Sequence, residues 1–262
     1  MTDAGEDTGV DLGGAVTMPM VGFGTWRLRG TRAYEAVRYA LEVGYRDLDT
    51  ATMYQNEAEV GRAVRDSGLD RREVFMTTKL PPENAGRERS TIEASLGVLG
   101  TDYVDLWLVH WPPSRSASVR VWEQFLIIRN EGLARAVGVS NYDAAGVDEL
   151  IRASGEHPAV NQLPWSLPGH DPKLLAAMRE RGVVVEGYSP LKGTNLRDQT
   201  LTHIAERHQV TPAQVVLRWH IQHGIPVIPK SAQPDRIASN FAVFGFSLSA
   251  DEMKALDALS RH

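Results

Sequence analysis

Hydrophobic positions along the chain alternate between two kinds of segment. Short apolar runs with strand character lie at residues 20–23, 45–48, 74–78, 104–109, 134–139, 159–161, 183–187 and 226–228. Each run is followed by a polar junction and then by a longer segment whose apolar residues recur at the spacing of an amphipathic helix. The pattern therefore predicts eight strand–helix units.

The predicted helices occupy residues 34–43, 57–67, 87–99, 121–131, 144–153, 172–181, 201–208, 212–223 and 250–259. Asp171 and Thr211 each stand directly before a proline, the arrangement of a helix cap followed by a first helical residue. Upstream of the repeats, residues 10–19 alternate around a Gly-Gly pair, which predicts a small β-hairpin.

Alternating strands and helices favour parallel strands joined by right-handed crossovers, in a closed barrel or in an open doubly wound sheet. An open sheet that binds a nucleotide usually carries G-x-G-x-x-G after its first strand. Here residues 22–26 read GFGTW, without the third glycine. The 262 residues also match the roughly 250 typical of one barrel, and no linker divides them. We predict an α/β protein, a single (β/α)₈ TIM barrel over residues 1–262 with an N-terminal β-hairpin.

Composition narrows the classes of partner. The net charge is -5 with no basic stripe, which argues against nucleic acid and against an anionic membrane surface. The first residues are acidic and polar, unlike a secretory signal, and no apolar run approaches the roughly 20 residues of a membrane span. The absence of cysteine excludes disulfides and thiolate chemistry. We expect a cytoplasmic monomer that acts on a small molecule.

In a (β/α)₈ barrel the active site lies at the carboxyl ends of the strands. Polar residues follow most of the apolar runs: Asp49 with Tyr54 just beyond, Lys79, His110, Ser140, Asn141, Gln162, Tyr188, Ser189, Lys230 and Ser231. We therefore expect these side chains to converge on one rim.

Asp49 and Lys79 follow consecutive strands, which are usually neighbours. A charge at the barrel mouth is costly without an opposite charge beside it, so an Asp49–Lys79 pair is expected. Such a pair is also compatible with a purely structural salt bridge. Only Asp49 and His110 on this rim are of metal-ligand type, so no metal site is expected.

Tyr54 changes the interpretation of that pair. A phenol with a pKa near 10 is a poor acid at neutral pH unless a nearby cation, here Lys79, stabilises its anion. A tyrosine so placed can protonate an oxygen that gains charge when hydride adds to a carbonyl. His110 could hydrogen-bond the same oxygen or relay a proton. The alternatives are a packed loop tyrosine and a core histidine.

The later strand ends have groups suited to a flat, amide-bearing ring. Ser140, Asn141 and Gln162 can bond a carboxamide, and Tyr188 has an aromatic face. Taken singly, each is compatible with ordinary turn chemistry.

Two cations and two neutral polar groups follow the last strand, near the start of a helix. They are Lys230, Ser231, Arg236 and Asn240. Barrels often bind phosphate at this place, although a solvated helix start would have a similar composition.

These residues lie in segments that resemble the aldo-keto reductase family over nearly the whole chain. The segments are residues 22–26 (GFGTW), 49–61 (DTATMYQNEAEVG), 78–80 (TKL), 105–112 (DLWLVHWP), 138–142 (GVSNY), 161–162 (NQ), 187–191 (GYSPL) and 228–231 (IPKS), with Arg236 and Asn240. The subgroup most resembled is that of bacterial reductases similar to 2,5-diketo-D-gluconate reductase.

The resemblance implies reduction of an aldehyde or ketone by NADPH, with a catalytic tetrad of Asp49, Tyr54, Lys79 and His110. It implies a nicotinamide held by Ser140, Asn141 and Gln162 and stacked on Tyr188. It also implies further cofactor contacts at Ser189, Leu191, Lys230, Ser231, Arg236 and Asn240. Trp26 and Trp111 are the implied substrate contacts.

The chain departs from the family pattern at several places. Residues 163–167 read LPWSL where many relatives have VELHP, Ser239 replaces an acidic residue, and Pro81-Pro82 replaces an aromatic. The chain ends shortly after the helix at residues 250–259, without the long loop that closes many family pockets. We expect an open substrate site.

Two other classes of function compete with a reductase. One is a nucleotide-sensing binding subunit, resembling the barrel subunits of potassium channels. The other is a barrel hydrolase, which the rim does not support because it lacks a carboxylate pair. The complete tetrad favours the enzyme.

Overall fold

The structure is a computed structural model that describes residues 9–259. A two-stranded antiparallel hairpin, β1 (Gly9–Asp11) and β2 (Thr17–Pro19), precedes the main sheet, as predicted. Eight parallel strands follow: β3 (Phe23–Gly24), β4 (Asp47–Asp49), β5 (Phe75–Leu80), β6 (Val104–Val109), β7 (Ala134–Ser140), β8 (Val160–Pro164), β9 (Val184–Tyr188) and β10 (Val227–Ile228).

The strands pair in chain order, and the first and last meet to close the sheet. Val21 bridges Val227, and the Gly24 amide donates to the Pro229 carbonyl at 3.1 Å. A Cβ at Gly24 would lie only 2.9 Å from the Ile228 carbonyl oxygen. Glycine in this first segment therefore lets two backbones approach, and the (β/α)₈ barrel is confirmed over the open sheet.

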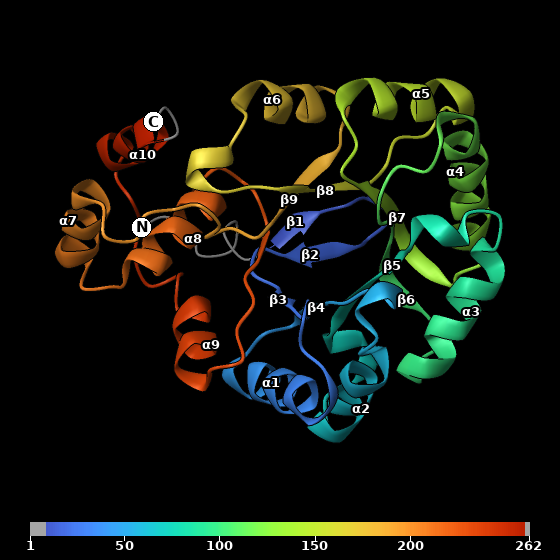
Figure 1. Cartoon of the computed structure of the whole chain (residues 1–262), viewed down its shortest axis with the longest axis horizontal. Helices are drawn as coiled ribbons and strands as arrows, with labels where there is room; N and C mark the ends of the chain where they lie inside the picture. Colours follow the sequence, from blue (N-terminus) through green and yellow to red (C-terminus); the bar gives the residue numbers. More distant parts are fainter. Residues whose placement is uncertain (1–8, 260–262) are drawn as a thin grey trace.

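The helices are α1 (Gly30–Val43), α2 (Glu57–Ser67), α3 (Glu88–Leu99), α4 (Arg115–Asn130), α5 (Ala144–Ser154), α6 (Pro172–Glu180), α7 (Gln199–His208), α8 (Pro212–Gln222), α9 (Pro234–Phe241) and α10 (Ala250–Ala258). Figure 1 shows α1 to α6 around the strands, with α7 and α10 farther out. The Asp171 and Thr211 side chains cap α6 and α8, as predicted. In residues 9–259 no helix is long and apolar enough to cross a membrane.

The run at residues 104–109 coincides with β6, and the other strands have at least one boundary that shifts by one to three residues from the apolar run. Tyr45 opens the second predicted strand but precedes β4. Its ring packs outward, 5.6 Å from Phe23 and 4.7 Å from Phe241 between ring centroids. Conversely, Asp49 and Lys79 fall inside β4 and β5. The apolar runs and the strands end at different residues for two reasons. Some apolar side chains pack between strands and helices outside the strand itself, and polar side chains at strand ends face the lumen while their backbone still pairs.

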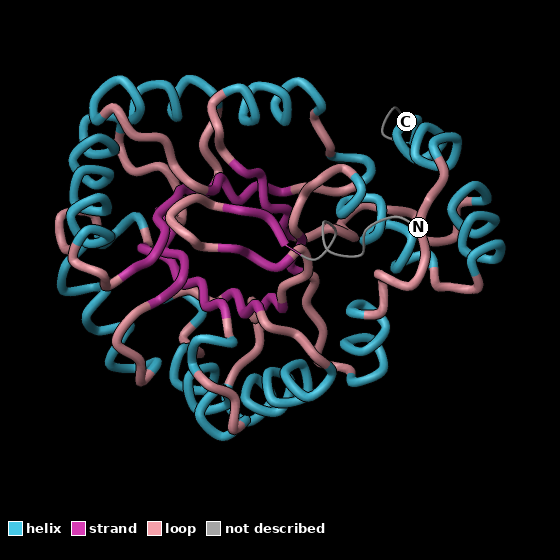
Figure 2. Tube along the Cα trace, turned by 180° about the vertical axis from the view of Figure 1, so that it is seen from behind, coloured by secondary structure: helices cyan, strands magenta, loops and turns pink. Residues whose placement is uncertain are grey.

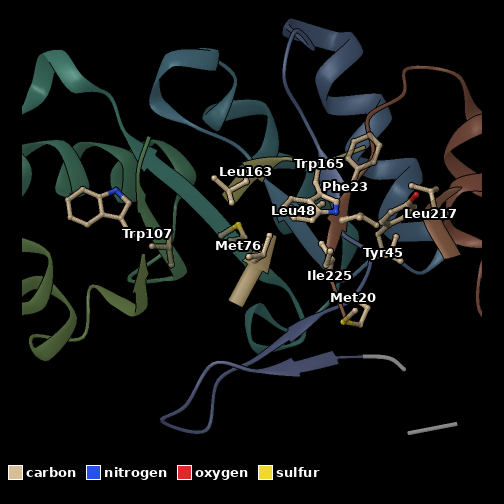
Figure 3. Close-up of a cluster of buried hydrophobic side chains, with 14 of the residues drawn as sticks. Met20, Phe23, Tyr45, Leu48, Met76, Trp107, Leu163, Trp165, Leu217 and Ile225 are labelled. Carbon is tan, nitrogen blue, oxygen red and sulfur yellow. The ribbon is translucent and has the colours of Figure 1, made fainter. Parts of the chain in front are cut away.

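Two apolar layers hold the barrel together. The larger lies between strands and helices, where Figure 3 shows side chains such as Phe23, Leu48 and Trp165. Inside the barrel, Val16 and Met18 of the hairpin pack with a buried cluster that includes Phe75, Leu106, Leu108, Ala136 and Val160. In Figure 2 the hairpin lies within the outline of the strand ring. The hairpin therefore closes one end of the barrel with apolar groups and leaves the carboxyl ends of the strands for chemistry.

Candidate active site

Asp49 and Lys79 form the predicted ion pair on neighbouring strands. Lys79 Nζ donates to Asp49 Oδ2 at 2.5 Å and to the Thr50 carbonyl at 2.9 Å, and both charged side chains are buried. Burial by itself lowers the pKa of Lys79. Asp49 and other nearby acidic groups together raise this pKa by more than burial lowers it, so it lies above the usual value. The site therefore contains a fixed cation.

Tyr54 closes a short 3₁₀ turn, Thr52–Tyr54, directly after β4. Its ring centroid lies 5.2 Å from Lys79 Nζ and 5.6 Å from the His110 ring centroid. Burial raises the pKa of the phenol, while the charge and hydrogen bonding of Lys79 lower it, and the net direction is upward. The structure thus brings Tyr54 beside the cation that its predicted role requires.

The turn that carries Tyr54 is anchored by Asn56, which sequence reasoning did not single out. This buried amide donates to the carbonyls of Thr25 and Leu28, both at 2.9 Å, and accepts from Thr50 Oγ1 at 2.6 Å. Gln55 before it adopts a left-handed conformation, with φ of 56°. The sequence signal for Asn56 was its position within residues 49–61, a segment that resembles the family.

His110 lies just after β6, on the rim beside Tyr54. Its backbone amide donates to the Leu80 carbonyl at 2.9 Å, and Nδ1 is buried without a partner among the described residues. Burial, with a smaller contribution from the Lys79 charge, lowers the pKa of His110 to about 3. At neutral pH the imidazole is therefore neutral, suited to hydrogen bonding and unsuited to act as a cation.

The residues expected to bind a carboxamide meet at the ends of β7, β8 and β9. Asn141 Nδ2 donates to the His110 carbonyl and to Ser140 Oγ, both at 3.0 Å. Its Oδ1 accepts from the Tyr188 hydroxyl at 2.9 Å. Gln162 Nε2 donates to Asp49 Oδ2 at 2.8 Å and to Glu186 Oε2 at 2.7 Å. One hydrogen-bonded network thus connects the tetrad to the residues expected to bind the carboxamide, which we call the cradle: Ser140, Asn141, Gln162 and Tyr188.

Of the residues expected to bind a phosphate, Lys230 and Ser231 follow β10, Arg236 lies in the first turn of α9 and Asn240 lies near the end of that helix. Ser231 and Asn240 are buried, while Lys230 and Arg236 are exposed. Ser231 Oγ accepts from the Gln233 amide at 3.0 Å and so shapes the turn into the helix. The two cations therefore remain available to an anion arriving from solvent.

Two further cofactor candidates, Ser189 and Leu191, are half-buried just after β9, where Ser189 has a left-handed φ of 55°. The substrate candidates Trp26 and Trp111 are 50% and 47% exposed. Sequence reasoning missed Met53, which is 46% exposed beside Tyr54. Trp26, Met53 and Trp111 are therefore exposed apolar side chains on the segments that follow β3, β4 and β6.

Two buried acids were also missed, Asp47 on β4 and Glu186 on β9. Burial raises the pKa of Asp47 well above its usual range, and the nearby charge of Glu186 adds to the effect. Burial, followed by the charge of Asp49, raises the pKa of Glu186 to about 7. Each acid lies inside an apolar run, and a charged residue within such a run was the sequence signal for a buried acid.

Comparisons with known proteins identify the family of the chain. A model of the Aldo/keto reductase family matches residues 20–261. An aldo-keto reductase of Mycolicibacterium vanbaalenii is 44% identical over 263 residues, covering 99% of this chain and 94% of that protein. 2,5-Diketo-D-gluconic acid reductase B of Corynebacterium sp. is 44% identical over 245 residues, covering 92% of this chain and 88% of that protein.

Solved structures give the same result. An aldo/keto reductase of Brucella melitensis superposes with a TM-score of 0.93 at 40% identity, covering 96% of this chain and 98% of that chain. An aldo-keto reductase of Bombyx mori, solved in complex with NADP, superposes with a TM-score of 0.90 at 31% identity, covering 97% and 93%.

Proposed function

The chain belongs to the aldo/keto reductase family, and from that premise we propose that it reduces an aldehyde or ketone with NADPH, using Tyr54 as the proton donor. Family membership makes it an NADP-dependent oxidoreductase. The single observation that carries the finer proposal is the convergence of Tyr54 and His110 on the buried Lys79–Asp49 pair.

The residues of the rim fit a nicotinamide dinucleotide. Tyr188 has a half-buried aromatic face, and its hydroxyl donates to the amide oxygen of Asn141. Gln162 has a further amide on the neighbouring strand β8. Lys230 and Arg236 would hold a 2′-phosphate, and the likeness to a Bombyx mori structure solved with NADP supports NADP(H) as the cofactor. When bound, the cofactor supplies the hydride.

The chain's own residues supply the proton. Hydride addition leaves negative charge on the carbonyl oxygen, which Tyr54 neutralises by donating its hydroxyl proton. Lys79 stabilises the resulting tyrosinate, and Asp49 holds Lys79 in place. His110 is neutral, so its role is to orient the oxygen by a hydrogen bond.

The surroundings of the tetrad suit a small carbonyl compound. Trp26, Met53 and Trp111 are exposed apolar side chains that follow β3, β4 and β6, so they are the candidates to line the mouth of the site and to contact a substrate arriving from solvent. The likeness to 2,5-diketo-D-gluconic acid reductase B adds keto-sugars to the candidates. A monomeric state and a cytoplasmic location remain part of the proposal.

The direct test is to follow NADPH oxidation by the purified protein with a panel of aldehydes, α-dicarbonyls and keto-sugars. Turnover that is saturable in both substrates supports the proposal. Tight NADPH binding with no turnover across the panel would contradict it and would favour the nucleotide-sensing binding subunit.

A further inference from the structure

The side chain of Gln162 has both of its N–H donors occupied by carboxyl groups. Nε2 donates to Asp49 Oδ2 at 2.8 Å and to Glu186 Oε2 at 2.7 Å. All three side chains are almost completely buried, with exposed fractions of 2% or less. Because an amide nitrogen has only two hydrogens, Gln162 has no donor left for a ligand.

The orientation of this amide follows from the chemistry of its neighbours. Asp49 forms a buried salt bridge with Lys79 at 2.5 Å, and a carboxylate in such a pair can only accept hydrogen bonds. An amide oxygen turned toward Asp49 would face another acceptor. Nε2 must therefore point to the carboxyl groups, and Oε1 lies on the opposite side of the planar amide.

The neighbouring amide of Asn141 is oriented in the same sense. Its Nδ2 hydrogens are donated to the His110 carbonyl and to Ser140 Oγ, while Oδ1 accepts from the Tyr188 hydroxyl. What both amides still have for a ligand is acceptor capacity. A subsite built of acceptors selects a group that donates N–H.

We propose that Glu186 is a positioning residue that holds Gln162 with Oε1 toward the bound cofactor, so that the subsite recognises the N–H donors of the nicotinamide carboxamide. This inference rests on the proposed function, because it concerns the cofactor of that reaction. Asp49 alone can take only one of the two amide hydrogens in a favourable geometry, since its Oδ2 is shared with Lys79. Glu186 takes the second.

The cost of placing a carboxyl group here supports a role beyond packing. Glu186 is fully buried in β9, its Oε1 has no partner among the described residues, and an apolar side chain of similar volume would avoid that cost. The charged or titratable groups facing it are Asp47 and Asp49 of β4 and Lys79 of β5. Of these, only Lys79 is a cation, so Glu186 is not there to complete an ion pair of its own.

The test compares two cofactors that differ only at the carboxamide. In the acetylpyridine analogue of NADP⁺ a methyl group replaces the amide nitrogen, so the N–H donors are lost. Dissociation constants for NADP⁺ and the analogue are measured by tryptophan-fluorescence quenching. The wild type should prefer NADP⁺ by about 2- to 10-fold, the effect of one hydrogen bond.

Three variants locate the origin of this preference. Glu186→Leu should lower the ratio of the two dissociation constants toward one, because Asp49 alone then holds the Gln162 amide and one of its N–H donors is freed. Glu186→Gln keeps an acceptor oxygen and should restore the wild-type ratio. In a Gln162→Leu background, Glu186→Leu should have no further effect on the ratio, which a general loss of structure would not reproduce.

An unchanged preference in Glu186→Leu overturns the proposal, and Glu186→Ala provides the same measurement if the leucine variant does not fold. Equal binding of both cofactors by a wild-type protein that turns over carbonyls overturns this inference and leaves the proposed function standing. Failure of the wild type to bind NADP⁺ at all overturns both.

Discussion

At the scale of single residues, the charge of Lys79 sets the chemistry of two neighbours in different ways. It lowers the pKa of Tyr54 against the stronger effect of burial, and it helps burial to lower the pKa of His110 to about 3. One cation therefore favours proton release from the phenol and keeps the imidazole neutral. The two rings can contact the same substrate oxygen without both competing to protonate it.

Replacing Tyr54 with phenylalanine should abolish turnover and leave NADPH affinity nearly unchanged. The ring contacts with His110 and Lys79 persist, while the only group lost is the hydroxyl that acts when charge develops on the substrate oxygen. We expect kcat to fall by about 10²–10⁴-fold or more. Steady-state rates and cofactor titrations measure the two effects separately. Retention of more than half the wild-type kcat would exclude Tyr54 as the acid.

The pairing of Asp49 with Lys79 could be predicted because opposite charges ending neighbouring strands have few other solutions. The hydrogen bonding within the cradle could not. Asn141 and Gln162 were predicted to bond a carboxamide, but which of their atoms are occupied by neighbours depends on rotamers and partners from distant strands. Glu186 was overlooked because a single acid in an apolar run does not show what faces it across the lumen.

At the scale of elements, close packing between α2 and α3 depends on Gly61. A Cβ at this position would collide with the Leu99 carbonyl oxygen at the end of α3. Gly61→Ala should therefore destabilise the protein by about 1–3 kcal/mol, because the helix must shift against its neighbour. Thermal or urea unfolding measures the change.

Gly97 in α3 is the matched control. A Cβ there would meet no atom within 4 Å, and the position is exposed. Gly97→Ala should stabilise the protein by about 0.5–1 kcal/mol through lower backbone entropy in the unfolded chain. If both alanine variants were equally stable, tight packing between the helices would not be the reason for glycine at residue 61.

All eight strands and the hairpin were predicted from periodicity, because apolar runs and glycine turns are local signals. Both ends were predicted correctly for β6 alone. Lys79 lies within β5 and Ser140 ends β7, since strand pairing continues past the last apolar residue when the polar side chain faces the lumen. Tyr45 was assigned to a strand because of its apolar character, although its side chain packs against α9, where it contacts Ile237 and Phe241.

We expect the segment from Lys230 to the first turn of α9 to set cofactor choice, because only NADPH has a 2′-phosphate that Lys230, Ser231 and Arg236 could bind. A charge-assisted hydrogen bond contributes about 1.5–3 kcal/mol, so Arg236→Ala should weaken NADPH binding by about 10–100-fold. The effect should be larger at low salt, since Arg236 is exposed. NADH, measured alongside by fluorescence quenching, is the control ligand. Equal losses for both cofactors would mean that Arg236 supports the fold instead.

At the scale of the whole molecule, the barrel interior divides into two parts. The hairpin end is filled with apolar side chains such as Met18 and Leu106. Deeper toward the carboxyl ends, Asp47, Asp49 and Glu186 share the lumen with one lysine, Lys79. The excess of acids over cations predicts that part of this layer is held protonated, at a cost to stability that depends on pH.

Glu186→Gln should raise stability at alkaline pH and change it little at acidic pH. The pKa of Glu186 is about 7 in the folded protein and about 4.3 in an unfolded chain, so between these values the folded state binds the extra proton. Stability is therefore lost as pH rises through this window, with the full penalty present above pH 7.

That penalty amounts to at most about 4 kcal/mol for this window, or several degrees in Tm. Glutamine keeps an acceptor for Gln162 Nε2 and cannot ionise, so it removes the penalty beside Asp49 without breaking the hydrogen bond. Melting curves from pH 4 to 9 would show the two proteins diverging as pH rises and running parallel above neutrality. Exposed Glu35→Gln is the control and should stay within about 0.5 kcal/mol of the wild type at every pH. A Tm difference between Glu186→Gln and the wild type that does not vary with pH would show that Glu186 carries no titrating charge in the folded barrel.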